Sequence, residues 1–202
     1  MDKILKFKKN IKGFSLVELI VVIAIMVILI ALLTPSIVGY IEKANNAADV
    51  SNAKTISSYL QLGLALAQNN SLDYTQTPWT GDRNSLYHGY IYVDDDEIRT
   101  SSMVIAEILE ENGILKPGAT QNVHMRQGKE PQFSKDKVNI LCQSKYTWDR
   151  YQINFVGKGR ALQFNYSACR KGKNKDSEAS GKFAGMIGGQ SSGNEITLGG
   201  KT

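Results

Sequence analysis

A run of apolar residues near the N-terminus constrains this chain more than any other feature. From Leu19 to Leu33 no residue is polar, and between Phe14 and Leu33 the only polar residues are Ser15 and Glu18. A helix of this length would span about 30 Å, because each helical residue rises ~1.5 Å, and that is the thickness of a bilayer core. The run therefore predicts a membrane-spanning helix rather than the buried helix of a soluble protein.

Glu18 is the one carboxylate inside this run. A charged side chain inside the hydrocarbon costs a few kcal/mol or more unless it is paired or reaches water. Two interpretations follow from the residues alone. Either Glu18 meets a partner within the membrane, or it lies at the membrane surface near the helix start, where the helix dipole favours an anion.

The residues that flank the run give its orientation. Five lysines precede it, at positions 3, 6, 8, 9 and 12, whereas the twenty residues after Leu33 hold only Lys43 against two acids. The positive-inside rule then keeps the N-terminus in the cytoplasm. A secretory signal would place a small-residue cleavage site soon after the run, but Thr34, Pro35 and Ser36 stand there instead.

The segment Gly13-Phe14-Ser15-Leu16-Val17-Glu18, with its basic leader and apolar continuation, resembles the processing motif of type IV pilins and pseudopilins. The resemblance covers about residues 8 to 40. It implies that a prepilin peptidase cuts after Gly13 and methylates the new N-terminus at Phe14, and that Glu18 is the glutamate used in assembly.

The function implied by this resemblance is structural. The chain would be a prepilin that polymerises through its apolar helix into a type IV pilus or a related pseudopilus, with roles in adhesion, motility or secretion. Its partners would be further copies of itself, the prepilin peptidase and an assembly platform. It would lie in the cell membrane as a single-pass protein before assembly and on the cell surface afterwards, and no cofactor is implied.

The positive charge of the chain belongs largely to the leader. Residues 1–13 hold five of the 24 basic residues and one of the 19 acidic residues, so their removal leaves 19 against 18, a net charge of +1 instead of +5. The basic leader indicates membrane orientation, and a nucleic-acid partner is not expected.

The helix is expected to continue beyond the membrane segment 14–34 as an amphipathic segment, 35–69, reaching about Gln68. Pro35 and Gly39 predict a kink or a softened segment. Apolar or small residues then recur mostly at helical spacing. They are Ile37, Ile41, Ala44, Ala48, Ile56, Leu60, Leu64 and Ala67.

Residues 70–202 are predicted to form an extracellular globular domain. It begins with a loop and a short strand, Gly89 to Val93, after which the acidic run 94–97 opens a helix from Glu97 to Glu111. A calcium site is the alternative for this run, but its spacing does not fit an EF-hand. Gly113 and Pro117 stop the helix.

A three-stranded antiparallel sheet is predicted at about 138–166. Val138 to Cys142 forms a short apolar strand, while Tyr151 to Phe155 and Leu162 to Tyr166 alternate apolar with polar residues. Such a sheet needs a cover, and the outer half of the long helix supplies one. The fold class is therefore α+β, with a long N-terminal helix packed on a small antiparallel sheet, as the resemblance to a pilin roll also implies.

The tail from Arg170 to Thr202 is rich in glycine, and only Phe183 to Ile187 and Ile196 to Leu198 are expected to add strands. Its basic beginning, Arg170 to Lys175, is interpreted as a solvated loop rather than a DNA site, because no aromatic residues are interleaved with the charges.

The two cysteines, Cys142 and Cys169, are each predicted to close a strand and to reach an oxidising compartment, which favours a disulfide between them. Two buried free thiols are the alternative.

Catalysis finds little support in the sequence. The two histidines, His88 and His124, fall in no metal-binding or nucleophile motif, and Gly157-Lys158-Gly159 lacks the rest of a phosphate loop. A membrane-anchored extracellular binding protein that never polymerises is the main alternative to a pilin. A secreted hydrolase would need a catalytic constellation that the sequence does not contain.

Overall fold

The computed structural model describes residues 13–69, 88–121, 123–126, 130–158, 161–173 and 175–191. The chain divides into two compact units, Met1–Ile41 and Glu42–Thr202.

The long N-terminal helix predicted from the sequence is confirmed as α1, Leu16–Asn69. Pro35 lies inside the helix without ending it, and the Thr34 hydroxyl donates to the carbonyl of Ile30 at 2.7 Å. Among the described residues, α1 is the one helix long and apolar enough to cross a membrane.

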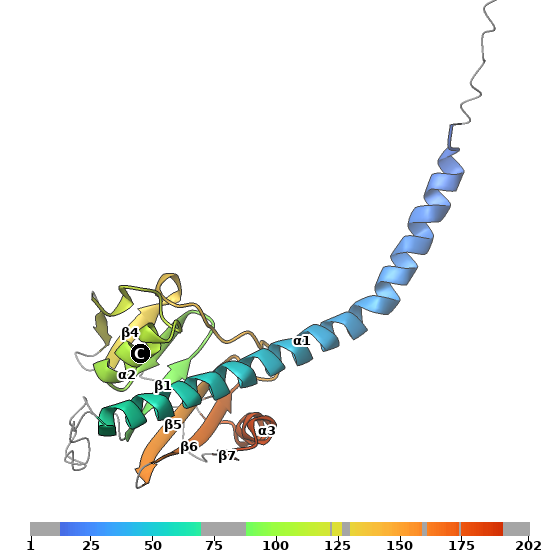
Figure 1. The fold of residues 1–202 in the computed structure, drawn as a ribbon. Coiled ribbons are helices and arrows are strands. Elements are labelled where there is room, and N and C mark those ends of the chain that lie inside the picture. The colour runs from blue at the N-terminus through green and yellow to red at the C-terminus, as the bar shows by residue number, and fades with distance from the viewer. Residues whose placement is uncertain are drawn as a thin grey trace, which may run out of the picture. The chain divides into compact units, whose positions relative to one another are not determined.

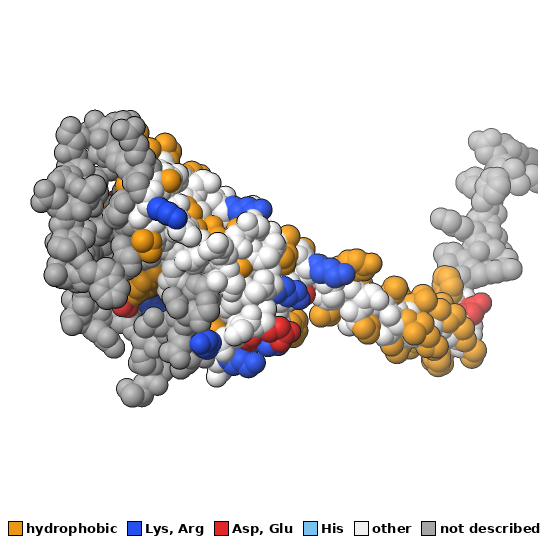
Figure 2. All heavy atoms as spheres, turned by 90° about the horizontal axis from the view of Figure 1, so that it is seen from below, with side chains coloured by type: hydrophobic (Ala, Val, Ile, Leu, Met, Phe, Trp, Pro, Cys, Tyr) orange, Lys and Arg blue, Asp and Glu red, His pale blue; other side chains and the backbone are white. Residues whose placement is uncertain are grey.

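The large apolar side chains of the described part of the first unit are exposed. Leu19 is 60% exposed and Ile25 is 53% exposed, and the large apolar residues between Leu16 and Ile41 share this exposure. Figure 2 shows hydrophobic side chains covering the N-terminal part of α1 on the face in view. A helix that is apolar all round is stable only when a membrane or other protein covers it.

The second unit is built on one seven-stranded sheet with the order β3-β4-β2-β1-β5-β6-β7. All neighbours are antiparallel except β6 and β7, which are parallel. The strands are β1 (His88–Val93), β2 (Glu97–Thr100), β3 (His124–Arg126), β4 (Glu130–Ser134), β5 (Arg150–Lys158), β6 (Ala161–Cys169) and β7 (Gln190–Ser191).

Three α-helices supply the cover for this sheet: the second half of α1, α2 (Met103–Glu111) and α3 (Ser177–Ile187). Two short 3-10 helices, η2 (Ala119–Gln121) and η3 (Lys135–Lys137), lie in the connections. In Figure 1 the second half of α1 runs along the sheet, and α3 lies beside β6. The predicted α+β class is confirmed, and the layout of a long helix on a sheet fits a pilin-like fold.

One core joins these helices to one face of the sheet. Its fully buried side chains include three from α1, one from each of the strands β1, β4 and β6, two from β5, and three from the other helices. They are Ile56, Leu60, Leu64, Ile91, Phe133, Ile153, Phe155, Ala168, Ile105, Leu109 and Phe183. Phe183 stacks on Tyr151 with 5.0 Å between the ring centroids, which fixes α3 on β5.

The opposite face of the sheet is polar. The register sets Tyr92 of β1 beside Arg99 of β2 and Gln152 of β5, and these side chains alternate with the apolar ones along each strand. The Arg99 guanidinium lies 3.8 Å from the centroid of the Tyr92 ring and 2.9 Å from the Glu97 carboxylate. The strand periodicity therefore separates a helix-facing apolar side from a polar side.

The predicted helix from Glu97 to Glu111 is wrong in its first part, because Glu97 begins β2. The Asp94 side chain accepts hydrogen bonds from the amides of Asp96 at 2.8 Å and Glu97 at 2.7 Å, which makes a turn between β1 and β2. The helix begins after Ser102, whose hydroxyl accepts from the amide of Ile105. The predicted end is confirmed, since α2 stops at Glu111 and Gly113 has a positive φ of 73°.

The predicted strand Val138 to Cys142 is also wrong. Only Val138 makes an isolated bridge, to Leu115. The Cys142 amide donates to the carbonyl of Asp94, and the next two amides bind a side chain of α1 instead of a neighbouring strand. The hairpin of β5 and β6 is as predicted. The other neighbour of β5 is β1 rather than the predicted strand Val138 to Cys142, so the sheet extends well beyond residues 138–166.

The predicted strand Phe183 to Ile187 lies inside α3. The Asp176 carboxylate caps this helix by accepting from the amide of Ala179 at 3.1 Å, and Gly188 ends it with a φ of 78°. The other predicted tail strand, Ile196 to Leu198, lies outside the described residues.

Substitution of a core leucine on α1 tests this packing. We expect Leu60→Ala to lower the free energy of unfolding of the second unit by about 2–5 kcal/mol, because Leu60 is fully buried between helix and sheet. Leu62→Ala is the matched control, since Leu62 is 49% exposed on the same helix and should change stability by no more than about 0.5 kcal/mol. Denaturant titration followed by near-UV circular dichroism measures both, and equal effects would contradict the packing.

Candidate functional site

Two hydrogen bonds of Ser15 close the start of α1, one to Glu18 and one from Val17. The Ser15 amide donates to Glu18 Oε2 at 2.8 Å, and Ser15 Oγ accepts from the amide of Val17 at 3.3 Å. The first helical backbone bond, from the Leu19 amide to the Ser15 carbonyl, has a length of 3.2 Å. Ser15 is therefore the N-cap, and Glu18 completes a capping box.

This cap places Gly13 and Phe14 outside the helix. Both precede the first helical residue, Leu16, and Phe14 is 90% exposed. The Gly13–Phe14 peptide bond thus lies in non-helical backbone directly before the N-cap Ser15. The helix begins two residues later than the predicted start at Phe14.

Glu18 has a partner inside its own chain, which neither interpretation of its role in the sequence analysis included. The signal was present as the Ser-x-x-Glu spacing before an apolar run. The carboxylate also lies in the first turn of α1, where the helix dipole favours a negative charge.

Comparison with family models matches residues 8–34 to the prokaryotic N-terminal methylation motif. The chain carries the signature of type IV pilins and pseudopilins. This match covers residues 8–13 of the predicted leader, the predicted cleavage point, Glu18 and the apolar run. No curated protein and no solved structure matches the chain. Members of this motif family are structural rather than catalytic proteins, and the apolar helix fits the membrane anchor of a pilin precursor.

Beyond the pilin signature, three polar residues on one face of α1 anchor a loop of the second unit. Glu42, Asn46 and Asp49 follow one another at spacings of four and three residues. They bind residues 142–148, which precede β5 and are called the anchored loop below. Asn46 Nδ2 donates to Thr147 Oγ1 at 2.9 Å.

Glu42 receives the tip of the anchored loop. Its Oε1 accepts from the Ser144 hydroxyl at 2.6 Å and from the amides of Tyr146 at 3.0 Å and Thr147 at 2.8 Å, while Oε2 accepts from the Lys145 amide at 3.3 Å. Partial burial raises the pKa of Glu42, but these hydrogen bonds outweigh it and hold the pKa below its ordinary value.

Asp49 receives the base of the same loop and is fully buried. It accepts from the amides of Gln143 at 2.8 Å and Ser144 at 3.0 Å, from Trp148 Nε1 at 2.9 Å and from the Cys142 thiol at 3.3 Å. Burial raises the pKa of Asp49, and the four donors offset this only in part. All four partners are donors, which is the arrangement that an ionised carboxylate satisfies.

Cys142 and Cys169 are free, buried thiols in the structure, so the predicted disulfide is not formed there. Cys142 belongs to the main core and donates to Asp49, whereas Cys169 packs with Tyr92 in a separate small cluster. Burial raises the pKa of both thiols, and the Asp49 charge raises that of Cys142 further. Neither thiol is therefore poised as a nucleophile.

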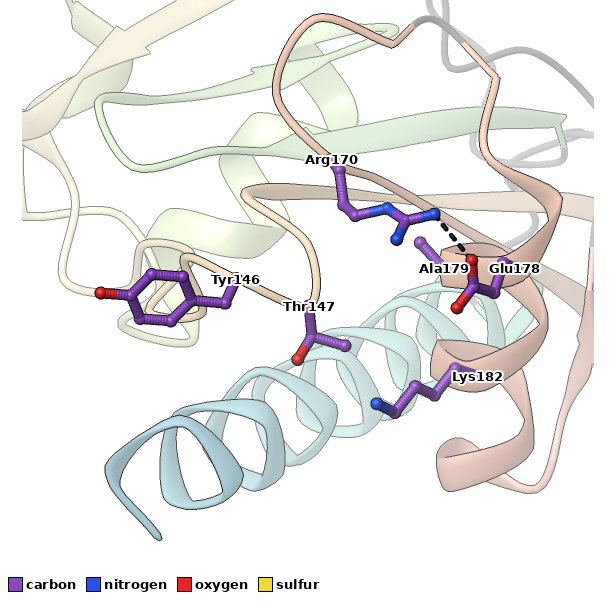
Figure 3. A pocket seen from close by; sticks show the side chains of 6 residues that line it. All are labelled: Tyr146, Thr147, Arg170, Glu178, Ala179 and Lys182. Atoms are coloured by element: carbon purple, nitrogen blue, oxygen red, sulfur yellow. Dashed lines mark hydrogen bonds and ion pairs between the residues drawn. The ribbon is translucent and has the colours of Figure 1, made fainter. Parts of the chain in front are cut away.

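Arg170, at the start of the basic segment after β6, pairs with two acids at the N-terminal end of α3. Arg170 makes a bidentate contact to Asp176, at 2.7 and 3.1 Å, and a further bond to Glu178 at 2.8 Å. These bonds hold the pKa of Asp176 well below its ordinary value. Arg170 and Glu178 line a shallow pocket between α3 and the anchored loop, together with Tyr146, Thr147, Ala179 and Lys182 (Figure 3).

The described part of the chain contains no cluster of three or more histidine, cysteine or acidic side chains that could hold a metal ion. His124 lies on the edge strand β3, and nothing is described for the side chain of His88. Gly157 and Lys158 lie at the end of β5, where they pair with Leu162 and Ala161 of β6, and Gly159 lies outside the described residues.

Removal of one acceptor should release the anchored loop. We expect Asp49→Asn to lower the free energy of unfolding by roughly 1–3 kcal/mol, because an amide has one acceptor oxygen and would leave a buried donor unpaired. Glu107→Gln, an exposed substitution with the same change of charge, should have an effect of about 0.5 kcal/mol or less. Denaturant titration at neutral pH gives both values, and a harmless Asp49→Asn would contradict the buried cradle.

The Glu42 cradle predicts a dependence of stability on pH. The folded-state pKa of Glu42 lies below its ordinary value of 4.5, so its contribution is present above that value and is lost as the pH falls through the folded-state pKa. The difference in unfolding free energy between the wild type and Glu42→Gln should therefore be positive at pH 7 and shrink in acid. A difference that is independent of pH would show that ionised Glu42 does not hold the loop.

Proposed function

We propose that this chain is a prepilin, the precursor of a structural subunit of a type IV pilus or related pseudopilus. Residues 1–13 are the leader, 14–34 the membrane and assembly segment, 35–69 its amphipathic continuation and 70–202 the extracellular domain. The observation that carries the proposal is the methylation motif at residues 8–34, joined directly to a helix whose apolar side chains lie exposed from Leu16 to Ile41.

The exposed apolar helix supports polymerisation. Such a surface is covered by lipid while the precursor is in the membrane, and outside the membrane it needs equivalent cover from protein. Further copies of the same helix supply that cover without any other partner. The chain then passes from a single-pass membrane protein, with its leader in the cytoplasm, to the core of an external filament.

Cleavage after Gly13 creates a positive charge that can set the position of one helix relative to its neighbour. It removes five lysines and creates an amine at Phe14 near Glu18. When apolar helices pack together, both charges lose water, so each is stabilised by meeting an opposite charge. We infer that Glu18 of an incoming subunit meets the Phe14 amine of its neighbour, and that a misplaced helix would leave a charge buried and unpaired.

A membrane-anchored binding protein that never polymerises is the second candidate. The shallow pocket at Arg170 and Lys182 is the observation in its favour. It does not account for a methylation motif, which an anchor does not need. A hydrolase is disfavoured because the motif belongs to structural proteins.

Processing can be read from the mass of the mature chain. We expect loss of residues 1–13 and one added methyl group on the amine of Phe14 in cells that contain a prepilin peptidase. The same chain from cells without the peptidase is the control and should keep its leader. An N-terminus beyond Leu33 would contradict the proposed cleavage site.

Glu18→Gln separates the charge of Glu18 from its capping role, because glutamine also serves at this position of a capping box. We expect the variant to be inserted and cleaved normally but to enter filaments at a small fraction of the wild-type level. Loss of one partner of a buried pair costs about 3–5 kcal/mol, which exceeds a hundredfold in equilibrium. Filament yield in cells without the wild-type copy measures this, and normal incorporation would reduce Glu18 to a surface carboxylate.

A further inference from the structure

The hydrogen bonds of Ser15 bear directly on the bond that the peptidase must cut. In an unbroken α-helix the carbonyl of Gly13 would accept from the amide of Val17, four residues later. That amide instead donates to Ser15 Oγ at 3.3 Å. The Ser15 amide is itself taken by Glu18 Oε2 at 2.8 Å. The cap therefore occupies the donor that would draw the Gly13 carbonyl into the helix.

We propose that Ser15 is a positioning residue for processing, which keeps the Gly13–Phe14 peptide bond out of α1 so that a peptidase reaches its carbonyl. This inference rests on the proposed function, because it concerns the same cleavage. Hydrolysis at this bond adds water, which gives a carboxyl group on Gly13 and an amine on Phe14. Outside the helix the carbonyl carbon is accessible to the nucleophile, and the carbonyl oxygen is free to accept from donors of the peptidase that stabilise its developing negative charge.

The same cap gives Glu18 a second task before assembly. In the described structure its carboxylate is bound to the Ser15 amide of its own chain, so it is satisfied at the helix start without a neighbour. Pairing with another subunit exchanges this bond for an ionic one. The capping box thus holds Glu18 of an incoming subunit in place until the Phe14 amine of its neighbour replaces the Ser15 amide.

Replacement of Ser15 tests the positioning role. Alanine at this position has no side-chain acceptor, so the Val17 amide becomes available to Gly13. We expect Ser15→Ala to lower the initial rate of cleavage of the full-length precursor roughly fivefold, the factor that corresponds to a typical lost N-cap. Ser15→Thr keeps the capping hydroxyl and should restore the rate. Ser36→Ala is the matched control, since it makes the same change in the same helix away from the cap.

A spectroscopic measurement distinguishes a change of conformation from a change of peptidase contact. Gly13-Phe14 is the only Gly-Phe pair in the sequence, so carbonyl-labelled glycine with nitrogen-labelled phenylalanine gives a single signal from the bond to be cut. In micelles this signal should have a non-helical carbonyl shift in the wild type and in Ser15→Thr. It should move toward the helical value in Ser15→Ala.

A normal cleavage rate for Ser15→Ala would overturn the inference, as would a reduced rate with an unmoved Gly13–Phe14 signal. The second result would mean that the peptidase contacts the Ser15 side chain directly and that the conformation of the Gly13–Phe14 bond does not depend on it. A different result would overturn the proposed function instead: the peptidase leaves the wild-type precursor uncleaved although its Gly13–Phe14 signal is non-helical. The conformation assigned to the Ser15 cap would still hold in that case.

Discussion

The apolar surface of α1 is the constraint on which the rest of this structure depends. In its second half the buried side chains Ile56, Leu60 and Leu64 lie against a sheet of the same chain. In its first half the apolar side chains are exposed in the part of their unit that the structure describes. One continuous helix therefore serves as the core element of a folded domain and as a surface that must find its cover elsewhere.

Three carboxylates of α1 are bound by backbone amides, and they differ in how firmly. Glu42 and Asp49 each accept four hydrogen bonds from amides and side chains of the anchored loop. Glu18 accepts one hydrogen bond among the described residues, from the amide of Ser15. The first two acids are held by the fold of the second unit, whereas Glu18 has one hydrogen bond to exchange for another. The second unit therefore satisfies Glu42 and Asp49 by itself, whereas in the proposed assembly Glu18 would exchange its one bond for a contact with another copy of the chain.

The sequence predicted the features that depend on long periodic patterns or on local spacing. The apolar run and the recurrence through Leu64 gave the long helix, and the alternation at Tyr151 and Phe164 gave the hairpin of β5 and β6. The predictions failed where a side chain distant in the sequence binds the backbone and so sets its local conformation. Amides of residues 143 and 144 bind Asp49 of α1, about ninety residues earlier, and no local pattern in Val138 to Cys142 reveals that a carboxylate replaces a strand partner.

Composition misled the prediction of the tail in a different way. Phe183 and Ile187 stand among glycines, which lower helix propensity, yet α3 forms because Asp176 caps it and Phe183 packs on Tyr151. At the N-terminus the roles of Gly13, Phe14 and Glu18 stay predictions, and the Ser15 cap was readable from the Ser-x-x-Glu spacing. The roles proposed for these residues in assembly depend on contacts between copies of the chain, which one sequence does not contain.

The central claim is that the mature chain builds an external filament through its apolar helix. Mechanical shearing of cells, followed by mass spectrometry of the purified filaments, tests this most directly. The account predicts filaments that contain this chain with Phe14 as its first residue, and none from cells whose only copy lacks the segment 14–34. Recovery of the mature chain solely from the membrane fraction, with no filament in the sheared material of peptidase-competent cells, would contradict it.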